Sequence, residues 1–357
     1  MSTKLLGVIA CHAVVLVLAG CGGERGADDT SSPIALAPLV TFEDADGSAV
    51  LWSYPVPSAK TRNGQYLISD EVSHGVIPVF DSTGRYLRSI GREGSGPGEY
   101  RRVSRILVLE SDSILVLDDQ LRRATILAPD LAYVRSFQFP AVPYDVVQIG
   151  ERTLAVTSAI PLPDSSFQVI NLEGGRVRAF ASNASAGGPP LPHVLARADS
   201  GFWSAPVAGG AEITFWDSRG DRVGSVPIAS DWMTPLRGGP ITPDSPPVSQ
   251  VRGLWAGQDG LLWILASVAD PEWAEGLGES GIGEGGVTSF RITDRDAVFD
   301  SVIEALDSRT GEVVASHRFD EEFRLVPFPG VVSRLVESPD AGLRLELFKV
   351  SLAPPQE

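Results

Sequence analysis

Short runs of apolar residues, separated by clusters of turn-forming residues, recur along most of the chain. Residues 106–109 and 114–117 both read ILVL, and the four residues between them, ESDS, favour a turn. Continuous apolar runs of this length are typical of strands that are covered on both faces. Comparable pairs lie at 146–149 with 154–156, 194–196 with 201–203, and 253–255 with 261–265. The pattern therefore predicts an all-β fold of many short strands.

A longer unit of strand, tight turn and strand repeats along the chain. Its clearest copy is residues 80–90, FDSTGRYLRSI, in which Asp and Ser can bond the backbone ahead and Gly accepts a positive φ. Further copies lie at 125–137, 169–180, 215–226 and 303–316. The turns fall near residues 82, 130, 173, 218 and 309, so the first three steps match the roughly 40 residues of a four-stranded propeller blade. The last step is about twice as long and leaves room for one unmarked blade and an insertion.

The C-terminal part predicts a last blade that is short of strands. Residues 331–336 and 343–352 supply apolar runs for a sixth blade. Residues 39–42, or a strand near 50–52, could complete that blade. A strand from the N-terminus that closes the ring would remove the open sheet edges. We therefore predict a six-bladed β-propeller over residues 34–357, with an N-terminal strand closing the last blade.

The segment 91–100, GREGSGPGEY, holds four glycines and a proline, and it suits a crossing between two sheets. It is not a phosphate loop, because Glu99 and Tyr100 follow where such loops place Lys and Ser or Thr before a helix. Together with the strand before it, the segment resembles six-bladed β-propeller lipoproteins related to NHL-repeat proteins. The resemblance covers about residues 34–352 and implies a ring with a central channel. It implies no function, because propellers host many activities.

The N-terminus resembles a bacterial lipoprotein signal. One charged residue, Lys4, precedes an apolar run from 5 to 18 and the sequence LAGC at 18–21. The apolar run is shorter than the roughly 20 residues that span a bilayer. The resemblance implies that residues 1–20 are a signal peptide and that Cys21 carries a lipid that anchors the protein to a membrane. Residues 21–33 are then a flexible tether.

This signal predicts an extracytoplasmic location in a bacterial cell envelope. Gly22 stands where many inner-membrane lipoproteins have Asp, which favours the outer membrane where the host has one. The only cysteines are Cys11 and Cys21, so we expect neither disulfides nor cysteine-ligated metals in the folded part. With 45 acidic and 29 basic residues the net charge is −16, and no nucleic-acid partner is expected.

Signals for catalysis are few. His74, His193 and His317 show no metal-binding spacing. Asp70, Asp118 and Asp119 follow apolar strands at equivalent places in the first two blades. Carboxylates repeated on blades could bind Ca²⁺ in the channel. Alternatively they bond the backbone of the next turn, which is the interpretation we favour, and we predict no cofactor.

The remaining candidate is the insertion at 270–295, which is Gly-rich and acidic and contains Trp273. Its composition favours a disordered surface loop, but connecting loops of propellers also carry binding contacts, so Trp273 is the candidate partner-binding residue. We predict a binding or scaffold module for a protein, peptide or glycan. The alternative is a channel-metal enzyme resembling gluconolactonase-like or sugar dehydrogenase propellers. Those enzymes combine acidic ligands with asparagines, and this chain has only Asn63, Asn171 and Asn183.

Overall fold

The computed structural model describes residues 33–43, 55–70, 75–140, 142–162, 165–180, 191–236, 241–282, 288–338 and 342–354. The predicted signal peptide, Cys21 and residues 22–32 of the predicted tether lie outside these ranges. The same holds for His74, for Asn183 and for the strand predicted near residues 50–52. No helix in the described part of the chain is long and apolar enough to cross a membrane.

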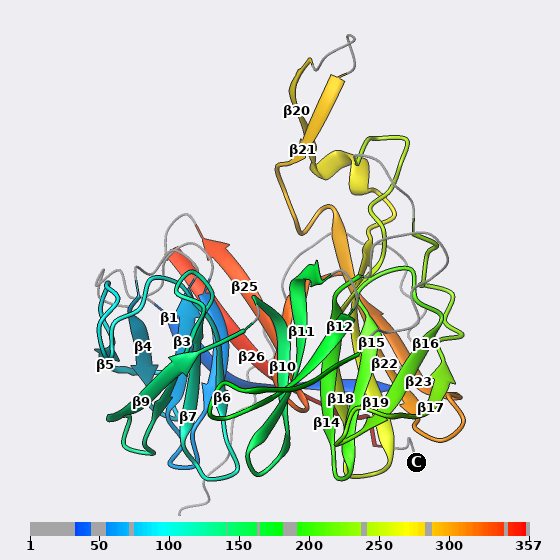
Figure 1. Ribbon diagram of the computed structural model, residues 1–357. Coiled ribbons are helices and arrows are strands. Elements are labelled where there is room, and N and C mark those ends of the chain that lie inside the picture. Colours follow the sequence, from blue (N-terminus) through cyan, green and yellow to red (C-terminus); the bar gives the residue numbers. More distant parts are fainter. Residues whose placement is uncertain are drawn as a thin grey trace, which may run out of the picture. The chain divides into compact units, whose positions relative to one another are not determined.

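Six four-stranded antiparallel sheets form the fold, and each is one blade (Figure 1). Their strands, from the innermost outward, are as follows. Blade 1 holds β2 (Pro55–Lys60), β3 (Tyr66–Asp70), β4 (Ile77–Phe80) and β5 (Tyr86–Ile90). Blade 2 holds β6 (Val103–Val108), β7 (Ile114–Asp118), β8 (Arg123–Leu127) and β9 (Tyr133–Gln138). Blade 3 holds β10 (Pro143–Gly150), β11 (Thr153–Leu162), β12 (Ser165–Asn171) and β13 (Arg176–Phe180). Blade 4 holds β14 (His193–Ala198), β15 (Gly201–Pro206), β16 (Glu212–Asp217) and β17 (Arg222–Pro227). Blade 5 holds β18 (Gln250–Ala256), β19 (Leu261–Ala269), β22 (Phe299–Asp307) and β23 (Val313–Phe319). Blade 6 holds β24 (Leu325–Phe328), β25 (Val331–Ser338), β26 (Gly342–Leu352) and β1 (Ile34–Glu43).

The blades close into a ring through their innermost strands. Each of these strands contacts the innermost strand of the next blade, from β2 through β24, and β24 contacts β2 again. The hydrophobic core lies between neighbouring blades: Val79 of blade 1 packs in one cluster with Ile106 and Val116 of blade 2. Because both faces of most strands are covered in this way, the central strands read as continuous apolar runs. The predicted all-β, six-bladed propeller is confirmed.

The N-terminal strand closes blade 6. Strand β1 pairs antiparallel with β26, from Ile34 opposite Leu352 to Glu43 opposite Arg344. The C-terminus supplies the other three strands of this blade. Of the two predicted candidates, the strand containing residues 39–42 is therefore the one that closes the ring. The pairing satisfies the backbone groups of β26 that would otherwise form an exposed edge.

The repeated turn joins the third and fourth strands of a blade. In four blades the side-chain Oδ1 of its first residue accepts two backbone N–H bonds; for Asp217 these come from Arg219 and Asp221, each at 2.9 Å. The other three first residues are Asp81, Asn171 and Asp307. The glycines that follow them have φ between 74° and 89°, namely Gly84, Gly174, Gly220 and Gly311. The Asx turn with Gly is therefore the local signal of these four blades.

One expectation about the repeat is wrong. The long step between the turns near 218 and 309 holds no additional blade, because blade 5 follows blade 4 directly in the ring. Two irregular segments take up the extra length. They are the crossing 228–249 between blades 4 and 5 and the insertion 270–298 between β19 and β22.

The glycine-rich crossing from blade 1 to blade 2 is held by Glu99. One oxygen of its carboxylate accepts the Gly96 backbone N–H at 2.7 Å, and the other accepts the Arg92 guanidinium at 2.7 and 2.9 Å. These bonds lower the pKa of Glu99. Tyr100 follows with 1% of its surface exposed, in the core between the blades. The motif is therefore a structural connector.

Two faces of the ring can be defined from this connectivity. The turn face carries the connections between first and second strands and between third and fourth strands. The loop face carries the crossings between blades and the connections between second and third strands. Each innermost strand starts at the loop face and ends at the turn face, because a crossing leads into it. The insertion 270–298 joins a second strand to a third and therefore belongs to the loop face (Figure 1).

Candidate functional site at the loop face

The centre of the ring contains a cavity of about 390 Å³. Residues of all six innermost strands line it: β2, β6, β10, β14, β18 and β24. Its size falls within the roughly 300–1,000 Å³ of pockets that bind small molecules. The channel predicted from the family resemblance is therefore present.

The charge of this cavity is opposite to that of the chain. Its lining includes six basic residues, Lys60, Arg105, Arg197, Arg252, Arg295 and Arg324. Only two acidic residues, Asp145 and Glu322, line it with them. The whole chain has a net charge of −16. Basic side chains are thus concentrated in the described channel of an acidic protein.

The arginines divide between the two ends of the channel. Arg105 is the third residue of β6, Arg252 is the third residue of β18, and Arg324 directly precedes β24. These three therefore lie at the loop-face end. Lys60 ends β2 and Arg197 is the last residue but one of β14, so both lie at the turn-face end.

The carboxylate of Asp145 accepts hydrogen bonds from two backbone N–H groups. Its two carboxylate oxygens accept the N–H groups of Val146 and Leu195, each at 2.8 Å. Burial raises the pKa of Asp145, whereas the positive charge of Arg105 and these two bonds act in the opposite direction. The Arg105 guanidinium itself donates to the carbonyl oxygens of Ser104 and Tyr144, at 2.9 and 2.5 Å. Arg105 is therefore oriented by carbonyl groups, and no carboxylate accepts a hydrogen bond from it among the described residues.

Glu322 is neutralised by arginines of its own cluster. Only 1% of its side chain is exposed, and Arg295 donates to its two oxygens at 2.5 and 2.9 Å. Arg324 approaches the same carboxylate, with its Nε 3.2 Å from Oε2. One carboxylate thus contacts two guanidinium groups.

Arg252, unlike Arg324, has no carboxylate beside its Nε among the described residues. Its Nε is buried and has no hydrogen-bond partner among the described residues. A buried N–H of a charged group without an acceptor is costly, so such a group calls for an explanation.

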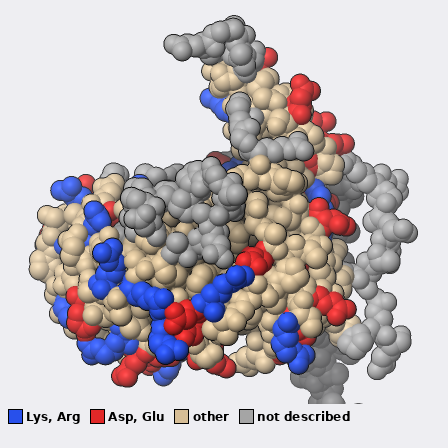
Figure 2. Space-filling view, turned by 45° about the vertical axis from the view of Figure 1, so that its right-hand side comes forward, with Lys and Arg blue, Asp and Glu red and all other residues tan. Residues whose placement is uncertain are grey.

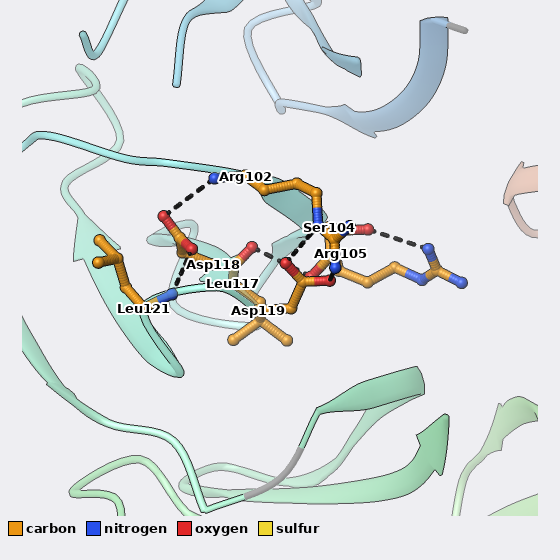
Figure 3. A network of polar contacts seen from close by, with 7 residues as sticks. All are labelled: Arg102, Ser104, Arg105, Leu117, Asp118, Asp119 and Leu121. Atoms are coloured by element: carbon orange, nitrogen blue, oxygen red, sulfur yellow. Dashed lines mark hydrogen bonds and ion pairs between the residues drawn. The ribbon is translucent and has the colours of Figure 1, made fainter. Parts of the chain in front are cut away.

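The carboxylates predicted as metal candidates lie outside the cavity lining. Asp118 accepts the backbone N–H groups of Arg102 at 3.4 Å and Leu121 at 2.8 Å, and Asp119 forms an ion pair with Arg102 at 2.6 Å (Figure 3). The backbone N–H of Arg101 also donates to Asp118, at 2.6 Å. Asp70 is 1% exposed at the end of β3. Among the residues that the structure describes, no group of three or more His, Cys, Asp or Glu side chains is arranged to hold a metal. The observed bonds of Asp118 correspond to the turn role that the sequence favoured.

Much of the insertion is ordered secondary structure, so the prediction of a disordered loop is wrong for its described part. A 3₁₀ helix, η1 (Trp273–Gly276), leads into an antiparallel hairpin of β20 (Leu277–Ile282) and β21 (Thr288–Ile292). Trp273 is half-buried, and its indole Nε1 donates to the carbonyl of Thr242 in the crossing 228–249, at 3.4 Å. Trp273 therefore braces the insertion against the crossing. Its role in binding a partner stays a prediction.

The exposed surface of the insertion is acidic. Glu272, Glu275 and Glu279 are exposed on its first half, and Asp294 and Asp296 are exposed near its end. In the space-filling view the projecting part of the molecule accordingly shows more acidic than basic side chains (Figure 2). The loop face thus combines an acidic projection with a basic channel mouth.

Sequence reasoning missed the channel arginines. They come from segments far apart in the chain, and only the ring brings them together. A local signal did exist: Arg105 and Arg252 each stand inside a strand that is otherwise apolar, at the same third position. A charged residue within a strand that is covered on both faces indicates a position at a channel or cavity.

Six four-stranded blades around a central cavity define this protein as a six-bladed β-propeller. Consistent with this, the family model DUF5128, described as a 6-bladed beta-propeller, matches residues 55–159. The closer relationship to NHL-repeat proteins stays a prediction. A search of curated proteins gives no match.

Several solved structures are similar to this chain. A predicted exported protein of Bacteroides fragilis is 11% identical with a TM-score of 0.58, and the match covers 90% of this chain and 96% of that protein. Virginiamycin B lyase of Staphylococcus aureus is also 11% identical, with a TM-score of 0.48, over 90% of this chain and all of the lyase (100%). A protein of unknown function from Bacteroides caccae is 14% identical with a TM-score of 0.45, over 77% of this chain and 88% of its own length. At such identities the likeness to the Bacteroides fragilis protein shows the fold alone.

Proposed function

We propose that this chain is a lipid-anchored, extracytoplasmic propeller that binds a macromolecular partner on its loop face. The observation that carries the proposal is the insertion 270–298. A propeller blade needs only a short connection between its second and third strands, whereas blade 5 has a 3₁₀ helix and a hairpin there. Long connections with their own structure in a compact domain usually serve function.

The insertion is held in place by contacts within the chain. Besides the bond from Trp273 to Thr242, the backbone N–H and the hydroxyl of Thr293 donate to the carbonyl of Gly276, at 2.9 and 3.0 Å. These bonds tie the two ends of the hairpin together. A rigid projection loses less conformational entropy on binding than a flexible loop does.

The direction of the chain supports binding on this face. Strand β1 starts at Ile34, at the turn face, where a blade joins its third and fourth strands. The chain therefore enters the propeller at the face opposite the insertion. The fold shared with a predicted exported protein of Bacteroides fragilis agrees with a location outside the cytoplasm.

The charge of the insertion favours one class of partner. Glu272, Glu275 and Glu279 are exposed, so a protein or peptide with basic groups is complementary to this surface. A glycan partner is the alternative. The metal-dependent enzyme class has no supporting observation among the described residues.

Site-specific photo-crosslinking on intact cells tests this function. A photoreactive amino acid replaces the exposed Glu279 on β20 in the full chain, and the control replaces the exposed Arg219 in a turn of the opposite face. We expect a discrete adduct from the Glu279 position only, with a partner that mass spectrometry can identify. The same adducts from both positions, or no adduct from position 279, would contradict binding through the insertion.

A further inference from the structure

We propose that the loop-face end of the channel binds a small organic carboxylate, whose carboxylate group lies between Arg105 and Arg252 and whose body is apolar. The site is centred on strands β6 and β18 of the channel, whereas the partner-binding proposal concerns the hairpin of the insertion.

The positions of the two arginines place them on opposite sides of the channel. Arg105 belongs to blade 2 and Arg252 to blade 5, and these blades are three steps apart in a ring of six. Counted back from the equivalent turns, the two positions differ by one residue, so both arginines lie near the loop-face end. Both line the central cavity of about 390 Å³. A ligand on the channel axis can therefore reach both guanidinium groups.

Both positive charges are available to a ligand. No described carboxylate accepts a hydrogen bond from Arg105, whose guanidinium donates to two carbonyl groups. The buried Nε of Arg252 has no acceptor among the described residues. Arg197 at the turn-face end is different, because it pairs with Glu110. An anion between Arg105 and Arg252 would accept hydrogen bonds from the terminal N–H groups of both guanidinium groups and balance their charge.

The two acids of the cavity restrict the charge of the ligand. The negative charge of Asp145 interacts with the positive charge of Arg105, and Glu322 lies beside Arg295 and Arg324. A dianion such as a phosphate monoester would be repelled by these carboxylates more strongly than a monoanion. The planar fork of a guanidinium group fits both carboxylates and phosphates, so the choice between them rests on the charge of the ligand. These features favour a carboxylate over a phosphate.

The remaining walls favour an apolar body. Leu254, Val326, Pro327 and Phe328 line the cavity alongside the charged groups. Small-molecule sites typically combine apolar walls with a few polar groups that fix the orientation of the ligand. A folded domain cannot enter a cavity of about 390 Å³, so the ligand is a small molecule or the end of a longer chain.

Calorimetric titration of the folded protein with defined probes tests the site. The probes are benzoate, its neutral isostere benzamide, and phenyl phosphate, each measured at low and at high salt. We expect benzoate to bind more tightly than the other two and to weaken with added salt. Benzamide binding as tightly as benzoate would overturn the role of charge, and tighter binding of phenyl phosphate would overturn the carboxylate class. Absence of benzoate binding at low salt would overturn the site itself.

Two matched variants locate the site. Arg252→Met removes the charge at the loop-face end, and Arg197→Met makes the same change at the turn-face end of the same cavity. We expect Arg252→Met to weaken benzoate binding by about tenfold or more and Arg197→Met to leave it within about twofold. Equal effects of the two variants would contradict the location. Because the probe comparison uses the unmodified protein, a variant that fails to fold leaves the proposal testable.

The two binding proposals fail independently. If no adduct forms at position 279 but benzoate binds, the partner-binding proposal is wrong and the channel site stands. If an adduct forms at position 279 but benzoate does not bind, the channel site is wrong and the partner-binding proposal stands.

Discussion

Phe42→Ala tests whether the N-terminal strand is part of the closed core. Phe42 lies on β1 in blade 6 with 0% of its surface exposed. Its ring centroid is 5.2 Å from that of Tyr66 and 5.0 Å from that of Phe80, and both partners belong to blade 1. This residue therefore links the first blade to the last one. Truncating a fully buried Phe costs about 3–5 kcal/mol, which includes the lost edge-to-face contacts.

Leu39→Ala on the same strand is the matched control. Leu39 is 38% exposed, so its truncation should cost less than about 1 kcal/mol. Urea unfolding followed by tryptophan fluorescence and by circular dichroism measures both variants. We expect one cooperative transition in each, with a much lower midpoint for Phe42→Ala. Equal stabilities of the two variants would refute the packing of β1 against blade 1.

Three further predictions concern backbone strain, pH and anchoring. Gly75→Ala should destabilise the fold by about 2–3 kcal/mol, because Gly75 has a φ of +79° and a Cβ there would lie 2.1 Å from the carbonyl oxygen of Tyr100. Gly98→Ala is the control in the same urea assay. Gly98 has a φ of +70° with open space around it, so this change should cost only about 1 kcal/mol. Burial lowers the pKa of His193 in the folded protein to about 4, whereas a histidine in the unfolded chain has a pKa of about 6.5. As the pH falls below about 6.5, His193 is therefore protonated in the unfolded chain before it is protonated in the folded protein, and the folded protein loses stability. Between pH 7 and pH 5 the wild type should therefore lose about 2 kcal/mol more than His193→Phe, and equal losses in urea unfolding at the two pH values would contradict this cause. Metabolic palmitate labelling should mark the wild type and not Cys21→Ala, and equal labelling would refute lipidation at Cys21.

The sequence predicted the blades because their determinants are local. The turn between third and fourth strands needs an Asp or Asn that bonds the backbone and a residue with positive φ, as in Asp217 and Gly220. The need for an N-terminal strand followed from counting the strands of the last blade. In blade 2 the turn position with positive φ holds Leu131 (φ 70°) and not Gly. The glycine signal is therefore missing from a turn of the same conformation.

The insertion could not be read correctly from composition. Strand β20 contains Gly278 and Gly281, and glycines in a strand normally indicate a loop or a bulge. Its pairing with β21 and the bond from Trp273 to Thr242 stabilise the hairpin instead. Such contacts join segments that the local pattern treats separately.

The channel site could not be predicted from the sequence for a related reason. A net charge of −16 averages over the whole chain, whereas the basic residues gather in one cavity. Two blades lie between Arg105 and Arg252 in the sequence, and only closure of the ring brings both residues to the same cavity.

The most direct measurement of an anion in the channel is the release of bound small molecules from purified protein. Wild type, Arg252→Met and Arg197→Met are purified in parallel, denatured, and compared by mass spectrometry of the released compounds. We expect a carboxylate with an apolar body to be released from the wild type and from Arg197→Met, and to be missing from Arg252→Met. The same compounds from all three proteins, or no carboxylate from the wild type, would contradict the binding of an anion at the loop-face end of the channel.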